Sequence, residues 1–210
     1  MKVLRSVLEI VKECRRAYIV LNVVYYGLVV VGMIYVAFNP SLQKTLLEAA
    51  GGAFTSGPFA VVGSAYSGGQ VLSAVALTFV VNLIVGSIAV ITLPSLVVPF
   101  SGLLVGAYRA VLWGLMLSPA APELRLIMIP HSLTLILEGQ AYILAMLAAY
   151  VHGRAFLWPQ SVDATSRRQG YVIGVKRSLR VYVLVVLVLA VAAVYEALEV
   201  ILFIRLAGAR

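Results

Sequence analysis

The hydrophobic positions of this chain fall into five long runs that are almost free of charged residues. A helix of about 20 apolar residues spans the roughly 30 Å hydrocarbon core of a membrane, because it rises about 1.5 Å per residue. We therefore predict an all-α, polytopic membrane helix bundle that forms a single domain over residues 1–210. The five predicted transmembrane helices are 17–38, 71–93, 95–117, 126–151 and 181–206.

Residues 1–16 have a different pattern, in which charged residues alternate with apolar ones. The apolar residues recur at the spacing of one helix face, which predicts an amphipathic helix. Its basic face suits anionic headgroups, and its apolar face suits the membrane interface. The segment can equally be a cytoplasmic extension of the first span, and the two interpretations are compatible. The apolar positions are Val3, Leu4, Val7, Leu8 and Val11.

The segment 42–70, between the first two spans, resembles neither a span nor an ordinary loop. Residues 42–50 have a short helical pattern, and residues 51–70 are rich in Gly and Ser with no charge. A loop in water normally carries more charge, so we expect an interfacial or re-entrant segment that rests on other helices. Backbone at that depth needs protein or water to satisfy its polar groups. A flexible loop is the alternative interpretation.

The distribution of basic residues predicts the orientation in the membrane. Residues 152–180 are polar and strongly basic, and we expect them to form a cytoplasmic loop. With the N-terminus inside, the cytoplasmic pieces hold eleven basic residues and the outer pieces hold four. Because basic residues prefer the cytoplasmic side, we predict a cytoplasmic N-terminus and an outer C-terminus in the cell membrane. The four outer residues are Lys44, Arg125, Arg205 and Arg210.

Composition supports a membrane protein and argues against several other classes. The chain is 62% hydrophobic and only 11% charged, whereas a soluble domain has about 25% charged residues. Its net charge of +8 comes from residues that flank the spans, so a lipid bilayer is the expected partner and nucleic acid is not. The single cysteine, Cys14, cannot form an intramolecular disulfide. Its basic neighbours Lys12, Arg15 and Arg16 are expected to lower the pKa of its thiol.

The chain lacks the motifs of the common enzyme and cofactor classes. It has no H-E-x-x-H, P-loop, G-x-S-x-G or dinucleotide motif. Its two histidines, His131 and His152, lie at opposite ends of one predicted span and cannot share a metal ion. We therefore predict a protein that is not an enzyme and has no cofactor, metal site or catalytic residue.

A small set of polar side chains lies inside the predicted spans, where burial is costly and usually marks a partner or a function. We expect Asn82 to hydrogen-bond to a neighbouring helix, and Arg109 to pair with a carboxylate on another helix or to snorkel outward. The set forms either a clamp that fixes helix packing or an outward-facing polar cavity. Its members are Asn82, Arg109, His131, Glu138, Glu196 and Glu199.

Two glycines in the third predicted span, Gly102 and Gly106, form a G-x-x-x-G pair. Such a pair leaves a groove without side chains, so another helix can approach closely at that point. We therefore predict that these two glycines lie at a helix–helix contact.

Four short motifs appear in order along the later spans: TFVVNLIVG, SGLLVGAY, IPHSLTLILEGQAY and AVAAVYEALEV. Together they resemble the stage II sporulation protein M family of five-span membrane proteins, over most of residues 70–205. The family's pattern is similar to P-H-G-x-x-E, whereas here Ser132 follows His131, and Glu138 comes a turn after Leu135. The resemblance implies a scaffold. The bacterial member holds cell-wall hydrolases at the septal membrane during engulfment, and relatives occur in archaea that do not sporulate.

From these observations we predict a non-enzymatic membrane scaffold that organises a membrane complex. We expect it to form a homodimer or another homo-oligomer and to bind other membrane or extracellular proteins. The alternative is a small channel or transporter whose outward-facing polar cavity is built from Arg109, His131, Glu138 and Glu196. A cavity that reaches Glu138 favours transport, and a dry pair between Arg109 and a carboxylate favours the clamp.

Overall fold

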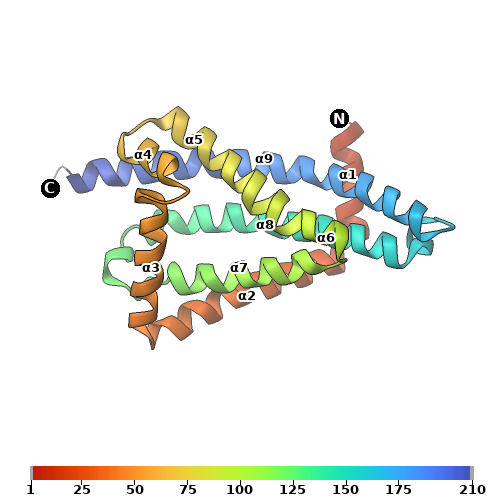
Figure 1. The fold of residues 1–210 in the computed structure, drawn as a ribbon, viewed down its shortest axis with the longest axis horizontal. Coiled ribbons are helices and arrows are strands. Elements are labelled where there is room, and N and C mark those ends of the chain that lie inside the picture. The colour runs from red at the N-terminus through yellow and green to blue at the C-terminus, as the bar shows by residue number, and fades with distance from the viewer. Residues whose placement is uncertain (1, 209–210) are drawn as a thin grey trace.

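The computed structural model describes residues 2–208, and within that range the chain folds into helices and turns without a strand. This confirms the all-α prediction. Four long helical segments and one shorter helix run alongside one another, and shorter helices lie across the two ends (Figure 1). Arg210, which entered the charge argument above, lies outside the described residues.

The N-terminal segment forms a helix of its own, α1 (Lys2–Glu13), which stands across the bundle axis (Figure 1). The chain turns at Cys14 before α2 (Arg15–Ala37) begins, so α1 does not continue the first long helix. Val7 and Ile10 of α1 are buried, and α1 packs on α9 (Arg167–Gly208). The apolar side of α1 thus meets protein, while Leu4 and Leu8 beside it remain exposed.

The segment after α2 is helical almost throughout, so the alternative interpretation of a flexible loop is wrong. It forms α3 (Pro40–Thr55), which crosses one end of the bundle, and the short α4 (Ala60–Ser67) (Figure 1). The buried Gln43 explains part of this placement. Its Nε2 donates to the backbone oxygens of Met116 (3.2 Å) and Ser118 (2.7 Å). These residues lie at the end of the helix Ser101–Met116, where backbone carbonyl groups have no partner within the helix.

The second long segment is continuous over Val71–Val97 and contains an unusual middle. It comprises α5 (Val71–Val80), the π-helix η1 (Val81–Thr92) and α6 (Leu93–Val97). The predicted break at Pro94 is wrong, because Pro94 lies in the first turn of α6, which follows η1 without a gap. The chain reverses instead at Val98–Phe100, where Phe100 has a left-handed backbone (φ 68°).

The third predicted span is shorter than expected. Its helix, α7 (Ser101–Met116), begins six residues later than predicted. A close backbone approach joins α7 to α2, where Gly114 meets Gly32 and Val29. The G-x-x-x-G pair is also buried, although with other partners: Gly102 packs on η1 and α6, and Gly106 packs on Met146 of α8 (Met128–Leu157).

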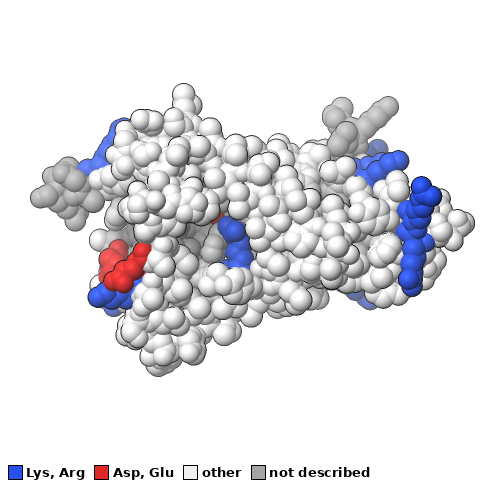
Figure 2. Space-filling model, in the orientation of Figure 1, with Lys and Arg blue, Asp and Glu red and all other residues white. Residues whose placement is uncertain are grey.

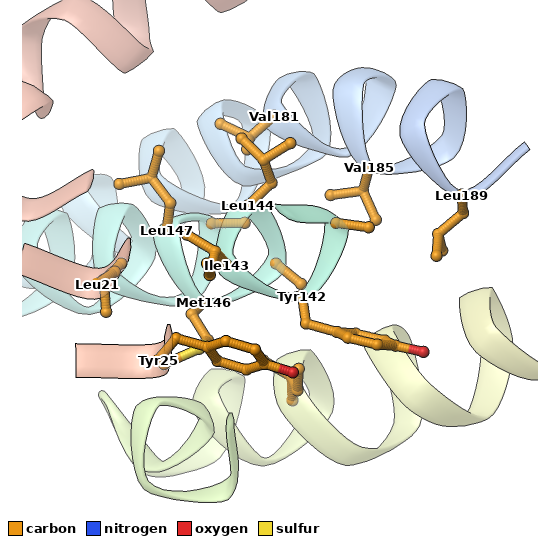
Figure 3. Packing of buried hydrophobic residues seen from close by; sticks show 14 of the residues in the cluster. Leu21, Tyr25, Tyr142, Ile143, Leu144, Met146, Leu147, Val181, Val185 and Leu189 are labelled. Carbon is orange, nitrogen blue, oxygen red and sulfur yellow. The ribbon is translucent and has the colours of Figure 1, made fainter. Parts of the chain in front are cut away.

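The last two long helices, α8 (Met128–Leu157) and α9 (Arg167–Gly208), form the core of the fold. Every residue from Ala141 to Ala149 is buried, because α2, α7, η1 and α9 surround α8. Figure 3 shows this packing from α2, α8 and α9. The side chains labelled there are Leu21, Tyr25, Tyr142, Ile143, Leu144, Met146, Leu147, Val181, Val185 and Leu189.

The basic segment 152–180 is not a loop, which corrects the prediction. Only residues 158–166 connect the two helices, through the short 3₁₀ helix η3 (Pro159–Val162). A second 3₁₀ helix, η2 (Pro122–Leu124), precedes α8. The start of α9 packs closely on α8 because Gly170 and Gly174 meet Ala155 and His152 there. The Ser178 hydroxyl adds a hydrogen bond to the Ala148 carbonyl (2.7 Å).

Four of the helical segments are long and apolar enough to cross a membrane: Arg15–Ala37, Val71–Val97, Met128–Leu157 and Arg167–Leu206. The helix α7 is apolar but has 16 residues, a length of about 24 Å. On the face shown in Figure 2, basic side chains lie at both ends and acidic ones at one end, and the surface between the ends is uncharged apart from a small charged patch in a hollow. This distribution suits insertion in a bilayer.

The contact between α2 and α7 generates the first prediction. A methyl group on Gly114 would overlap the backbone of Val29, so we expect Gly114→Ala to destabilise the protein by about 1–3 kcal/mol. Thermal unfolding of the purified protein in detergent measures this. Gly27→Ala on α2 is the matched control, because nothing lies within 4 Å of that position. Equal unfolding temperatures for the two variants would contradict the close approach.

Candidate functional site

The structure brings five of the six predicted polar residues to one cavity of about 210 Å³. They come from η1, α7, α8 and α9, and residues of α3, α4 and α5 complete the lining. Figure 2 shows a hollow on this face beside α3, with basic and a little acidic surface inside it. A neighbouring cavity of about 200 Å³ shares two of the five residues, Asn82 and Arg109. The five are Asn82, Arg109, His131, Glu138 and Glu196.

Glu138 is the most deeply placed of these residues, with 6% of its surface exposed. Its Oε1 accepts a hydrogen bond of 2.5 Å from Nδ2 of Asn82. Asn82 stands at the start of the π-helical turn, and its own backbone oxygen accepts a bond from the Ser87 hydroxyl (3.0 Å). The expectation that Asn82 bonds to a neighbouring helix is confirmed, and its partner is the buried carboxyl group.

Glu196 of α9 lines the same cavity as Glu138. Oε2 of Glu196 is buried without a partner among the described residues. Two ionised carboxylates in one small cavity repel each other strongly in a medium of low dielectric constant. A proton shared between them, or a bound cation, removes that repulsion.

Arg109 does not form the expected ion pair with a carboxylate. Its Nη2 donates to the Tyr142 hydroxyl (2.7 Å), and its guanidinium group lies 3.9 Å from the centre of the Tyr142 ring and 5.2 Å from that of Trp113. Aromatic faces attract cations, so these rings stabilise the charge without neutralising it. The Nε atom is buried without a partner in the described chain. Arg109 therefore holds a positive charge at the cavity wall.

His131 and Glu199 form a second polar contact. The His131 Nδ1 lies 3.2 Å from Oε1 and 3.3 Å from Oε2 of Glu199, and the Thr134 hydroxyl donates to the same carboxylate at 2.9 Å. Glu199 is thereby fully engaged and does not line the cavity, whereas His131 does. This pair also joins α8 to α9 near the end of the bundle that carries α3.

Several residues of the site were missed by the sequence analysis. Tyr142 and Trp113 are aromatic residues in apolar helices, a pattern that normally indicates core packing, and nothing local marks them as partners of Arg109. A separate polar network joins α2 to α8: the Tyr18 hydroxyl donates to Oε1 of Gln140 (2.7 Å), whose Nε2 donates to Asn22 (2.6 Å). That network accounts for Gln140, which lies outside the cavity.

Comparison with known proteins adds no assignment to this geometry. No family model, no curated protein and no solved structure matches the chain. The resemblance to stage II sporulation protein M therefore stays a prediction, and the candidate function depends on the cavity itself.

The position of Arg109 generates the second prediction. Tyr142→Phe keeps the ring but removes the acceptor of the arginine, so we expect a loss of about 1 kcal/mol of stability. Denaturant titration of the purified protein in micelles measures the change. Tyr108→Phe is the control, because Tyr108 is exposed and lies on the same helix as Arg109. If both variants unfold at the same denaturant concentration, the hydrogen bond contributes nothing.

Proposed function

We propose that the chain is a multi-pass protein of the cell membrane with five transmembrane helices. Four helical segments have sufficient length, and α7 supports a fifth crossing because it runs from the end that holds α6 to the end that holds α3 (Figure 1). The shorter α7 is covered on several sides by α2, α8 and η1, so its length need not match the bilayer by itself. The crosswise helices α3 and α4 are then an interfacial layer at the outer surface.

The proposed orientation has a cytoplasmic N-terminus and an outer C-terminus. The start of α9 and the helix α1 lie at one end of the bundle, where Arg177 pairs with Glu13 and Arg180 bonds to Ser6. This end carries most of the basic residues, which is the mark of the cytoplasmic side. The polar cavity then opens toward the outer half of the membrane, beneath α3 and α4.

We propose that this cavity belongs to a small channel or transporter and that its ion is a proton. One observation carries the proposal: Glu138 and Glu196 line the same cavity, and among the described residues neither forms an ion pair with a basic side chain. Carboxyl and histidine groups inside a membrane bundle are the usual components of proton relays. His131, on the same cavity wall and bonded to Glu199, supplies a second titratable group between Glu138 and the outer end.

Arg109 gives the cavity its electrostatic character. Its charge is held by two aromatic rings and one hydroxyl, so it acts on the carboxyl pair across the cavity rather than through a direct bond. A fixed positive charge opposes the entry of other cations and favours a site that exchanges a proton between two carboxyl groups. On the cytoplasmic side of Glu138, the buried stretch Ala141–Ala149 closes the path. In this proposal, the cavity is reached from the outer side only.

A non-enzymatic scaffold is the second candidate function. The hydrogen bond from Asn82 to Glu138 favours it, because this bond joins two of the motifs on which the family resemblance depends. In that case the polar cluster fixes helix packing, and the function lies in oligomerisation and in other membrane or extracellular partners. The two candidates differ in one measurable property, which is ion flux.

The proposed topology can be tested with cysteine labelling in a Cys14→Ser background. Glu123→Cys lies before α8, and Gln160→Cys lies between α8 and α9; both positions are exposed. In intact cells a membrane-impermeant maleimide is expected to label Glu123→Cys alone, and to label Gln160→Cys only after lysis, because the basic end faces the cytoplasm. The reverse labelling pattern would show that the orientation is inverted. Labelling of both positions in intact cells would show that α8 does not cross the membrane.

The transport proposal is tested by proton flux into liposomes that contain the purified protein and a pH-sensitive dye. We expect Glu138→Gln and Glu196→Gln to lower the flux at least roughly tenfold, because an amide cannot take up and release the proton. Each variant must elute as a single species in gel filtration.

The matched control is Glu123→Gln, an exposed carboxylate outside the cavity, which should keep the wild-type rate. A wild-type protein that gives no more flux than empty liposomes would overturn the transport proposal and leave the scaffold. Unchanged flux in both cavity variants would also overturn it.

A further inference from the structure

A second polar pocket lies at the opposite end of the bundle from the candidate site. It has a volume of about 310 Å³ and is enclosed by the α1–α2 turn, the end of α8, the helix η3 and the start of α9. Its polar lining comprises Arg154, Arg177, Ser161, Glu13 and Cys14. Residues far apart in the sequence thus meet at the cytoplasmic end of the proposed topology, where the spanning helices leave the membrane.

The charges of this pocket do not balance. Arg177 pairs with Glu13, whereas Arg154 forms no ion pair with a carboxylate of the described chain. The two arginines and one glutamate give the pocket a net charge of one positive unit. Arg154 is partly buried, and a partly buried charge without a partner favours the binding of an anion.

The cysteine in the pocket does not supply the missing negative charge. Burial raises the pKa of the Cys14 thiol above its ordinary value, although Arg154 and Arg177 act in the opposite direction. The thiol is therefore neutral at pH 7. The expectation that Lys12, Arg15 and Arg16 lower this pKa is wrong, because the thiol is buried away from the surface and burial is the larger effect.

Hydrogen-bonding atoms of the pocket also lack partners. The Arg177 Nε and the Ser161 hydroxyl are both buried and make no hydrogen bond within the described residues. Arginine N–H groups and a serine hydroxyl are donors that suit the oxygens of a phosphate group. An adjacent cavity of about 300 Å³ shares Glu13 and Arg177 and adds Lys176 and Arg180 at its exposed side. Figure 2 also shows basic surface at this end of the molecule.

We propose that the pocket lined by Arg154, Arg177 and Ser161 binds a phosphate group. One phosphate diester neutralises the excess charge and takes up the free donors, and arginine is the side chain best suited to bind it. Basic pockets between helices at the cytoplasmic surface commonly hold the headgroups of anionic lipids, so a lipid is one source of the phosphate. A free phosphate compound from the cytoplasm is the other. This inference is independent of proton transport.

The test measures binding to the full-length purified protein by native mass spectrometry and by the shift in its thermal unfolding. Two probes separate the sources: phosphatidylglycerol added to phosphatidylcholine bilayers, and inorganic phosphate added in pure phosphatidylcholine. We expect Arg154→Gln to weaken binding of the effective probe by at least roughly tenfold, since a charge-assisted hydrogen bond is lost. Arg168→Gln, an exposed basic residue at the same end, should change it less than about twofold.

Arg154→Gln must unfold at the same temperature as the wild type in phosphatidylcholine, which shows that any loss of binding is not caused by a loss of folding. Ser161→Ala is the second variant. Selective binding of phosphatidylglycerol supports a lipid headgroup, and selective binding of inorganic phosphate supports a soluble ligand. Equal weakening in Arg154→Gln and Arg168→Gln would show general surface attraction and overturn the site. Binding of neither probe would overturn it as well.

Discussion

The carboxyl group of Glu138 is buried near the middle of an apolar helix, where an unpartnered charge costs several kcal/mol. Much of the surrounding structure can be understood from this constraint. Asn82 donates to it from η1, and Glu196 approaches it from α9. Arg109, held by aromatic rings on the wall of the same cavity, adds a positive charge without closing the cavity by a direct ion pair. The polar side chains of four helical elements therefore converge on one point.

The cavity is asymmetric along the bundle, and this follows from the size of the side chains at each level. Toward the end with α3 and α4, the walls hold Asn82, His131 and both carboxyl groups, and about 210 Å³ stays empty. Toward the basic end, α8 presents mainly Ala, Leu and Ile between α2, α7 and α9, and these fill the space. Close packing of this kind excludes water and ions. One half of the bundle is thus suited to bind polar groups, and the other half is suited to block their passage.

Structural features that depend on composition could be predicted well from the sequence, whereas features that depend on side-chain packing could not. The long apolar helices and the convergence of Asn82, Arg109, His131, Glu138 and Glu196 followed from hydrophobic runs and from the cost of burying polar groups. The partner of Arg109 did not follow, because a tyrosine in an apolar run looks like any other core residue.

Helix boundaries failed for a related reason. Pro94 was read as a break, yet it fits the first turn of α6. The basic segment after α8 was read as a loop because of its charge, yet Gly170 and Gly174 allow it to pack as helix. Charge indicates where water is, but it does not indicate whether the backbone there is helical.

The elements around the cavity differ in how firmly they are fixed. The α8–α9 pair is held at one end by the bond from His131 to Glu199 and at the other by the bond from Ser178 to Ala148, with an apolar seam between them. By contrast, η1 is π-helical over Val81–Thr92, a conformation that is rarely longer than one turn and that often marks functional sites. A change from π-helix to α-helix would alter the rotation of the segment that carries Asn82. Asn82 donates directly to Glu138, so η1 is the element that supplies the hydrogen bond to the buried carboxyl group. The firmly held α8–α9 pair therefore acts as the frame, and η1 carries the donor that meets it at Glu138.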